Sequence, residues 1–305
     1  MAEKKEQIIA IIGPTGVGKT ALSIELAKVL DGEIISGDSI QVYRGLDIGS
    51  AKVTKEEQQG IPHYLIDEYD YTQDYNVKLF QQRCRETIAQ IQAKGKQPII
   101  CGGTGLYIKA ALYDYVFLDE LQDETHQRFL ESLSNDELYA ALSIIDAPAC
   151  QQIHKNNRRR LIRALMIAHS GKKKSEIINE QAHQPLYDLF LIGLTMPREQ
   201  LYARIDQRVD QMMENGLLQE VTQLAQEESI WSSAGFKGIG YKEWYAYFHG
   251  TSDKETCIDQ IKKNSRNFAK RQYTWFRNQL PVHWYDISDP DWKQQIQLDL
   301  AEWRK

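Results

Sequence analysis

One glycine-rich motif near the amino terminus limits the fold of this chain more than any other feature. Residues 13–20 read Gly-Pro-Thr-Gly-Val-Gly-Lys-Thr and fit the pattern G-x-x-x-x-G-K-[ST]. An isoleucine-rich run at 8–12 precedes the motif, and apolar residues at helical spacing follow it as far as Leu30. A glycine-rich turn between a buried strand and a helix presents backbone N–H groups and a helix amino terminus to an anion. The motif therefore predicts an α/β fold with a site for a di- or triphosphate.

The individual residues of this motif, called the phosphate loop below, suit that chemistry. Glycines let the backbone wrap around phosphate oxygens, the lysine supplies a positive charge, and the last hydroxyl can hold Mg²⁺. The residues predicted on this basis to bind the phosphates are Gly13, Gly16, Gly18, Lys19 and Thr20. Thr20 is also the predicted metal ligand. The motif alone leaves open which di- or triphosphate binds and what reaction follows.

Composition and charge set only wide bounds. A chain of 305 residues with 42% hydrophobic and 26% charged residues suits a soluble protein of one or two domains. No apolar run reaches membrane-spanning length, and residues 1–7 contain no apolar signal core, so we expect a cytoplasmic protein without membrane contact. The 4 cysteines lie far apart without a C-x-x-C pair, which favours reduced thiols over zinc. The net charge of −5 argues against indiscriminate nucleic-acid binding but allows a local basic face, and a monomer is the default expectation.

Polar residues follow two of the predicted strands. Asp38 comes just after an apolar strand at 33–36, and Thr104 comes just after one at 98–101. Because residues beyond the carboxyl ends of parallel strands line the ligand crevice, both side chains are expected near the phosphate loop. Both residue types also suit helix caps and turns, so a purely structural role stays open for each.

Strand patterns disappear between residues 116 and 189, where the sequence is polar and helical. A buried strand returns at 189–194, and Pro197 then opens a helix at its first position. The predicted fold is therefore a P-loop NTPase-like parallel sheet with helices on both faces, built from residues 1–115 and 190–305. An all-helical insertion domain at 116–189 interrupts it.

Basic residues gather in three segments. The insertion contains an arginine-rich run at 158–163, and the tail contains a glycine-rich, aromatic loop at 235–242 and a basic amphipathic helix at 262–277. Such runs are commonly solvated faces. Because acids are nearly absent across the first one, contact with a phosphate backbone is an equally good interpretation of it. Trp275 and Phe276 are more typical of a core than of a base-stacking platform.

The surroundings of the phosphate loop bear on the reaction. A hydrolytic motor or switch needs an apolar strand ending in Asp to assist Mg²⁺, but the strand at 98–101 is followed by Gly-Gly-Thr. Only the predicted short strand at 61–67, which ends in Asp67, resembles that element. The combination favours a transferase that brings a diphosphate to a nucleic acid. A small-molecule kinase, a transferase acting on free adenine nucleotides and a non-catalytic RNA-binding switch are the alternatives.

The sequence resembles the tRNA dimethylallyltransferases, also called tRNA isopentenyltransferases. The matching runs occur in the family's order and span nearly the whole chain: 13–20, 38–52, 102–107, 159–165, 197–213, 238–241 and 270–275. Eukaryotic members carry a carboxyl-terminal zinc finger, whereas this sequence has neither C-x-x-C nor paired histidines before Lys305. The resemblance is thus to the bacterial type.

The resemblance implies a reaction. A dimethylallyl group passes from dimethylallyl diphosphate to N6 of the adenosine immediately 3′ of the tRNA anticodon, and diphosphate is released from the phosphate loop without nucleotide hydrolysis. Asp38 matches the position of a general base, and Arg208 matches an arginine that stabilises the leaving group. Thr15 and Thr104 match substrate-contacting positions, and Mg²⁺ is the implied cofactor.

The resemblance also implies recognition of the tRNA anticodon stem-loop. An unpaired adenosine must leave its stack to reach the crevice, and basic side chains hold the surrounding phosphates. The residues implied to contact tRNA are Asp38, Ser39, Ile40, Gln41, Arg159, Arg160, Arg163, Lys237, Gly240, Tyr241 and Lys242.

Overall fold

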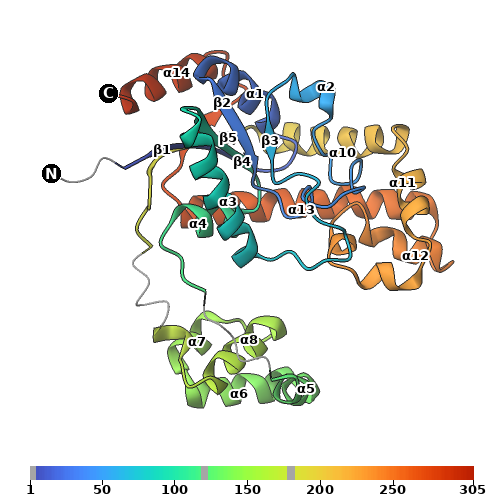
Figure 1. Cartoon of the computed structure of the whole chain (residues 1–305). Helices are drawn as coiled ribbons and strands as arrows, with labels where there is room; N and C mark the ends of the chain where they lie inside the picture. Colours follow the sequence, from blue (N-terminus) through green and yellow to red (C-terminus); the bar gives the residue numbers. More distant parts are fainter. Residues whose placement is uncertain (1–4, 118–122, 177–182) are drawn as a thin grey trace. The chain divides into compact units, whose positions relative to one another are not determined.

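The chain folds into two compact units, each described here by itself. The computed structural model describes residues 5–117, 123–176 and 183–305 (Figure 1). One unit comprises residues 1–113 with 185–305, and the other runs from Asp114 to Gln184. The first unit is an α/β layered domain and the second contains helices only among its described residues. In the described part of the chain, no helix is long and apolar enough to cross a membrane.

A six-stranded parallel sheet forms the centre of the first unit, in the order β3-β2-β4-β1-β5-β6. Strand β1 pairs with β4 on one side, where Ile9 faces Ile99, and with β5 on the other, where Ile9 faces Phe190. Since strands flank β1 on both edges and helices cover both faces, its isoleucines are fully buried. The strands are β1 (Gln7–Ile12), β2 (Gly32–Ser36), β3 (His63–Tyr64), β4 (Gln97–Gly102), β5 (Asp188–Thr195) and β6 (His283–Asp286).

Helices cover both faces of this sheet, which confirms the predicted fold class (Figure 1). Helices α3 and α4 pack on one face through residues such as Phe80 and Ile108, while α1 and α14 pack on the other through Leu26 and Leu300. The long helix α13 contributes to both apolar clusters. The helices of this unit are α1 (Lys19–Leu30), α2 (Lys55–Gln58), α3 (Val77–Ala93), α4 (Gly105–Leu112), α10 (Arg198–Glu214), α11 (Leu217–Leu224), α12 (Tyr245–Phe248), α13 (Lys254–Gln279) and α14 (Trp292–Trp303).

The strand predicted at 61–67 is much shorter than expected, because only His63 and Tyr64 pair with β2. Leu65 and Asp67 adopt left-handed backbone conformations, with φ of 59° and 56°, and this turns the chain out of the sheet. Leu65 is nonetheless buried in the core. The apolar run before Asp67 is therefore a short strand followed by a turn, and the prediction of a full strand is wrong.

The second unit has a small core of its own. Its helices pack around buried residues such as Leu138, Leu142 and Leu161. Ser134 and Glu137 form a capping box at the start of one helix, and Asp146 caps the next. The described helices are α5 (Glu124–Ser132), α6 (Asn135–Ile145), α7 (Ala147–Gln152) and α8 (Arg158–His169).

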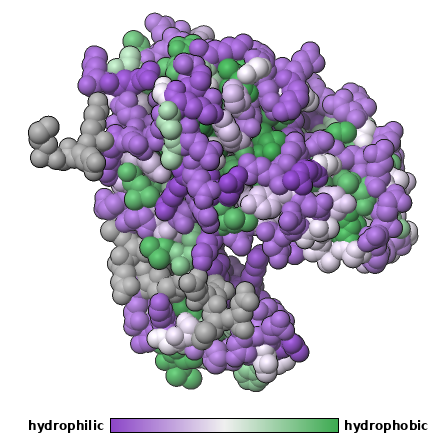
Figure 2. Space-filling model, in the orientation of Figure 1, coloured by the Kyte–Doolittle hydropathy of each residue, from purple (hydrophilic) through white to green (hydrophobic). Residues whose placement is uncertain are grey.

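The two chain segments that connect the units are paired with each other. Tyr113 and Pro185 form an antiparallel bridge, and the Leu186 N–H donates to the Leu112 carbonyl at 3.0 Å. The helical unit therefore ends at Gln184, a few residues before the predicted boundary at 189, because the returning segment already belongs to the α/β unit. Figure 2 shows a mostly hydrophilic surface with apolar residues in small separate patches.

Candidate active site

A cavity opens at the carboxyl ends of three neighbouring strands, β2, β4 and β1. It lies entirely in the α/β unit. Ligands of parallel α/β sheets bind at this edge. The polar side chains that line it include residues of the phosphate loop, of β4, of the segment after β2, and of α10 and α13: Thr15, Lys19, Thr20, Asp38, Gln41, Cys101, Arg208 and Gln272.

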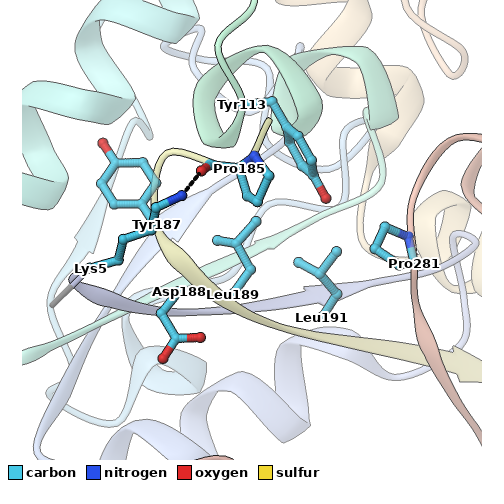
Figure 3. Close-up of a pocket in the computed structure, with 8 residues that line it drawn as sticks. All are labelled: Lys5, Tyr113, Pro185, Tyr187, Asp188, Leu189, Leu191 and Pro281. Carbon is cyan, nitrogen blue, oxygen red and sulfur yellow. Dashed lines mark hydrogen bonds between the residues drawn. The ribbon is translucent and has the colours of Figure 1, made fainter. Parts of the chain in front are cut away.

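A second hollow, in Figure 3, lies beside the amino-terminal half of β5. Its lining includes Tyr113, Tyr187, Leu189 and Leu191, and Lys5 donates a hydrogen bond to the Pro185 carbonyl. No residue of the phosphate loop reaches it. Ligand sites combine an apolar wall with convergent polar groups. The cavity at the carboxyl ends of β2, β4 and β1 has such polar groups, so it is the candidate active site.

The phosphate loop adopts the strained turns that its glycines permit. Gly13 has φ of 139°, and a Cβ there would lie 2.8 Å from the Leu194 carbonyl oxygen. Gly16 has φ of 81°, and a Cβ there would lie 3.1 Å from Cγ1 of Ile205. Any larger residue would push the loop away from β5 and α10, so the backbone N–H groups could no longer converge on an anion.

Lys19 lines the cavity and is half-buried. Its Nζ donates to the Pro14 carbonyl at 2.7 Å. The pKa of Lys19 is lowered to about 8, chiefly because burial disfavours the charged form and also because Arg208 lies nearby, whereas Cys101 and Asp38 act in the opposite direction. A bound anion would supply the negative charge that this ammonium lacks, so the site is electrostatically prepared for a phosphate.

Arg208 extends from α10 towards the same place. Its Nη1 lies 3.4 Å from Thr15 Oγ1 and its Nη2 lies 3.4 Å from the Ala51 carbonyl, both long contacts. Burial lowers the pKa of the guanidinium, and Asp38 partly offsets this. Among the described residues no carboxylate pairs with Arg208 within 4.0 Å. This half-buried guanidinium is therefore available to a bound anion.

Asp38 has both of the roles between which the sequence did not decide. Its Oδ1 accepts from the Ile40 N–H at 2.8 Å and the Gln41 N–H at 3.3 Å, which is a turn-capping arrangement. The same side chain lines the cavity. In the described structure no donor occupies Oδ2, so one oxygen shapes the turn and the other is open to a substrate.

Thr104 lies directly after β4, and its contact with substrate stays a prediction. It occupies the N-cap position of α4, but its side chain accepts no capping hydrogen bond. It is also not among the residues that line the cavity, whereas Gly102 and Gly103 are. Its backbone N–H instead donates to the Gly37 carbonyl at 3.2 Å and joins the segments after β2 and β4.

Gln272 is a site residue that the sequence reasoning missed. Its buried amide on α13 accepts from the Thr15 N–H and donates to the Gly103 carbonyl, both at 2.9 Å. It thus connects the phosphate loop to the segment after β4. The spacing of Gln272 between the buried Ala269 and Phe276 was a usable signal, because a polar residue on an apolar helix face is commonly bonded.

His63 is another lining residue that the sequence did not single out. Its Nδ1 lies 2.8 Å from the Ile61 carbonyl, while its Nε2 is buried without a hydrogen-bond partner. Burial lowers the pKa of this imidazole. His63 is the first of the two residues of β3, and its pairing with Ile34 of β2 places it beside the cavity.

The residues implied to contact tRNA lie in different environments. Arg159, Arg160 and Arg163 are exposed on α8 of the helical unit, whereas neighbouring Arg158 is bonded to the Leu133 and Glu131 carbonyls. Ser39 and Ile40 are half-buried beside Asp38, and Lys237 and Lys242 are exposed. The predicted groups on α8 and in the tail are therefore accessible as cations.

Tyr241 and Gly240 need a correction. The Tyr241 ring is fully buried, and its hydroxyl donates to Glu220 at 2.7 Å. Gly240 is also buried, in a turn with φ of 97°. The segment expected to be an open basic loop folds into short 3₁₀ turns, because its aromatic residues Phe236 and Tyr241 enter the core. The Tyr241 side chain is thus not an RNA contact in this structure.

A family model described as IPP transferase matches residues 41–279. The chain belongs to the IPP transferase family. A relative named tRNA dimethylallyltransferase from Anoxybacillus flavithermus is 52% identical over 285 residues, which cover 93% of this chain and 91% of the relative. Another of that name from Bacillus cytotoxicus is 50% identical over 302 residues, covering 97% and 95%. The resemblance read from the motifs is confirmed.

Solved structures agree with this assignment to the IPP transferase family. The full-length tRNA isopentenylpyrophosphate transferase of Bacillus halodurans superposes with a TM-score of 0.75 at 44% identity, covering 98% of this chain and 97% of that one. A eukaryotic dimethylallyltransferase acting on tRNA gives a TM-score of 0.85 at 32% identity, covering 97% and 79%. The predicted enzyme class, a prenyltransferase, is therefore confirmed.

Proposed function

We propose that this protein transfers a dimethylallyl group from dimethylallyl diphosphate to N6 of the adenosine immediately 3′ of the anticodon in tRNA. Two lines of support are the names of relatives that share about half its residues and a structural neighbour that acts on tRNA. The observation that carries the proposal is geometric. One cavity is lined by a carboxylate, Asp38, and by two half-buried cations, Lys19 and Arg208.

The phosphate loop is the proposed seat of the diphosphate. Its backbone N–H groups, Lys19 and Thr20 surround one end of the cavity, and Arg208 approaches from α10. As the allylic C–O bond breaks, charge builds on the departing oxygens, so these fixed positive groups stabilise the transition state more than the bound donor. Thr15 provides a hydroxyl within reach of Arg208 and of the same phosphates.

Mg²⁺ is the proposed cofactor. The described residues contain no group of three or more acidic, histidine or cysteine side chains that could hold a metal alone. The Thr20 hydroxyl at the start of α1 fits a different arrangement, in which magnesium keeps several waters and is bound chiefly by substrate phosphates. Bound there, the ion would neutralise charge on the diphosphate.

Asp38 is the proposed general base. The amine nitrogen forms a bond to the allylic carbon, the carbon–oxygen bond breaks with its electron pair going to diphosphate, and the amine proton passes to a carboxylate oxygen. The free Oδ2 of Asp38 suits that last step, while Oδ1 keeps the turn in place. Thr104, which matches a substrate-contacting position of the family, is proposed as a secondary contact only.

The acceptor requires a second binding region for tRNA. The exposed Arg159, Arg160 and Arg163 of the helical unit are proposed to hold phosphates of the anticodon stem-loop, as are Lys237 and Lys242 of the α/β unit. Flipping one unpaired adenosine into the cavity costs a few kcal/mol, which those contacts offset. A cytoplasmic monomer is the setting we propose for this reaction.

A transfer assay tests the proposal directly. The protein is mixed with Mg²⁺, labelled dimethylallyl diphosphate and an anticodon stem-loop with adenosine 3′ of the anticodon, and ATP and AMP serve as control acceptors. Label in the stem-loop alone is the expected result. Label in ATP or AMP would instead make the protein a free-nucleotide prenyltransferase. ATP hydrolysis without any transfer would favour a kinase or switch.

A further inference from the structure

The segment that carries Asp38 continues as a closed loop to Ala51, called the acceptor loop below. Gln41 Nε2 donates to the Ser50 and Ala51 carbonyls, both at 3.3 Å, and so ties the start of the loop to its end. The end is also the place where Arg208 approaches the Ala51 carbonyl. A change in the shape of this loop would therefore move the proposed base and the arginine contact together.

The far side of this loop is held by a single carboxylate from another element. Glu220 on α11 accepts hydrogen bonds from three consecutive backbone N–H groups, those of Asp47 at 3.1 Å, Ile48 at 2.7 Å and Gly49 at 3.1 Å. It accepts a fourth from the Tyr241 hydroxyl at 2.7 Å. A carboxylate has about four acceptor positions, so these donors satisfy Glu220 completely.

Close packing makes this arrangement specific. A Cβ on Gly49 would lie 2.6 Å from the Tyr241 ring, and a Cβ on Gly240 would lie 2.8 Å from the Gly49 carbonyl oxygen. Burial, followed by the charge of Glu220, raises the pKa of Tyr241, so the phenol remains a donor. The loop thus rests directly on an aromatic ring whose hydroxyl is fixed by the same carboxylate.

We infer that Glu220 is a positioning residue that, with Tyr241, holds the acceptor loop in the shape that directs Asp38 at the acceptor base. The inference rests on the proposed function for the role of Asp38. The physical reason is that three consecutive backbone N–H groups need more acceptor positions than one oxygen offers, and the two oxygens of a carboxylate supply them. An uncharged side chain leaves at least one of them without an acceptor.

The test compares Glu220→Gln with the wild type and with Gln223→Ala, an exposed residue of the same helix. The glutamine keeps the size of the side chain but offers one oxygen, so the loop loosens. We expect kcat for stem-loop prenylation to fall about 10- to 100-fold, as for a misplaced catalytic group. The affinity for a saturated alkyl diphosphate should stay within about twofold, because the phosphate loop is untouched.

Hydrogen exchange gives a readout that does not depend on activity. The amides of residues 47–49 should exchange at least about tenfold faster in Glu220→Gln, while those of β1 and β4 keep their protection. Gln223→Ala should match the wild type in every measurement. If Glu220→Gln is too unstable to purify, Tyr241→Phe removes one hydrogen bond of the four and should shift kcat and exchange in the same directions by a smaller factor.

Unchanged kcat together with unchanged exchange at 47–49 would overturn the inference. So would a loss of alkyl diphosphate affinity as large as the loss of kcat, since that would mean general damage to the site. Failure of the proposed function is distinguishable, because it would appear as a wild-type protein that prenylates no stem-loop. The exchange comparison would then still decide whether Glu220 holds the loop.

Discussion

Single residues in this cavity combine roles that are usually assigned to different side chains. Asp38 closes a turn with one oxygen, and its side chain also lines the cavity. Lys19 is bonded to a backbone carbonyl while its burial favours the uncharged form. Each of these two residues therefore has a structural role and a chemical role, and a conservative substitution can separate the measurable consequences of the two.

Asp38→Asn separates the two roles of the carboxylate. The amide oxygen can still accept from Ile40 and Gln41, so the turn should survive, but no basic oxygen remains. We expect single-turnover prenylation of the stem-loop to slow about 10²- to 10⁴-fold, the range for loss of a general base. Asp38→Ala, which also removes the turn contacts, is the comparison. Near-normal turnover of the asparagine variant would remove Asp38 as the base.

Lys19 gives donor binding a dependence on pH. Because its pKa is lowered to about 8, Lys19 is charged below that pH and loses its proton above it in the free protein. An anion binds the charged form, so the affinity for a saturated alkyl diphosphate should be constant below pH 8 and weaken by up to about tenfold per unit above it. Calorimetry from pH 6.5 to about 9.5 measures this, and affinity rising with pH would contradict it.

Among the elements, α13 shows how a distant segment completes a site. Gln272 joins the phosphate loop to Gly103, across more than half of the chain. Gln272→Leu should leave the Thr15 N–H and the Gly103 carbonyl unpaired, which costs about 1–3 kcal/mol for each group in the free energy of unfolding. Diphosphate affinity should fall as well. Asn278→Ala, an exposed change on the same helix, is the control, and equal denaturation midpoints for both variants would argue against the connection.

Helix α8 is the element on which the proposed tRNA contact can be isolated. Replacing Arg159, Arg160 and Arg163 by Gln should weaken stem-loop binding and reduce the slope of log affinity against log salt by about 0.7–0.9 for each phosphate that the protein no longer neutralises. Alkyl diphosphate affinity should not change, since the phosphate loop belongs to the other unit. An unaltered salt slope would show that this basic run is a solvated surface.

Local patterns predicted the elements around the phosphate loop well and the carboxyl-terminal loops poorly. Between a buried strand and a helix, the motif at 13–20 forms a phosphate-binding turn, so the position of Lys19 could be predicted directly from the sequence. The loop containing Tyr241 did not, because its direction is set by Glu220, twenty-one positions earlier in the chain. Gln272 was missed for the same reason, since its partners Thr15 and Gly103 are distant in the sequence, whereas His63 was missed because the run at 61–67 reads as an ordinary strand.

At the scale of the whole molecule, net charge and local charge act separately. The chain carries a net charge of −5, yet the exposed cations proposed for tRNA occur in the helical unit and in the tail of the α/β unit. The negative total charge repels polyanions in general, whereas the local cations attract a polyanion that contacts them. Nonspecific binding of polyanions is therefore disfavoured. Moderate salt should therefore lower the affinity for an unrelated RNA by a larger factor than the affinity for the stem-loop. A competition filter-binding assay measures this difference.

The bridge between Tyr113 and Pro185 bears on how a chain of this architecture could evolve. The chain leaves the α/β unit and returns to it at one point, so the helical unit could be gained, lost or exchanged by a single insertion event without breaking a strand of the sheet. An ancestral phosphate-binding domain could thus acquire a new class of acceptor while its donor site stayed intact. In this architecture a helical unit can be replaced without altering the residues that line the cavity, because all of them belong to the α/β unit.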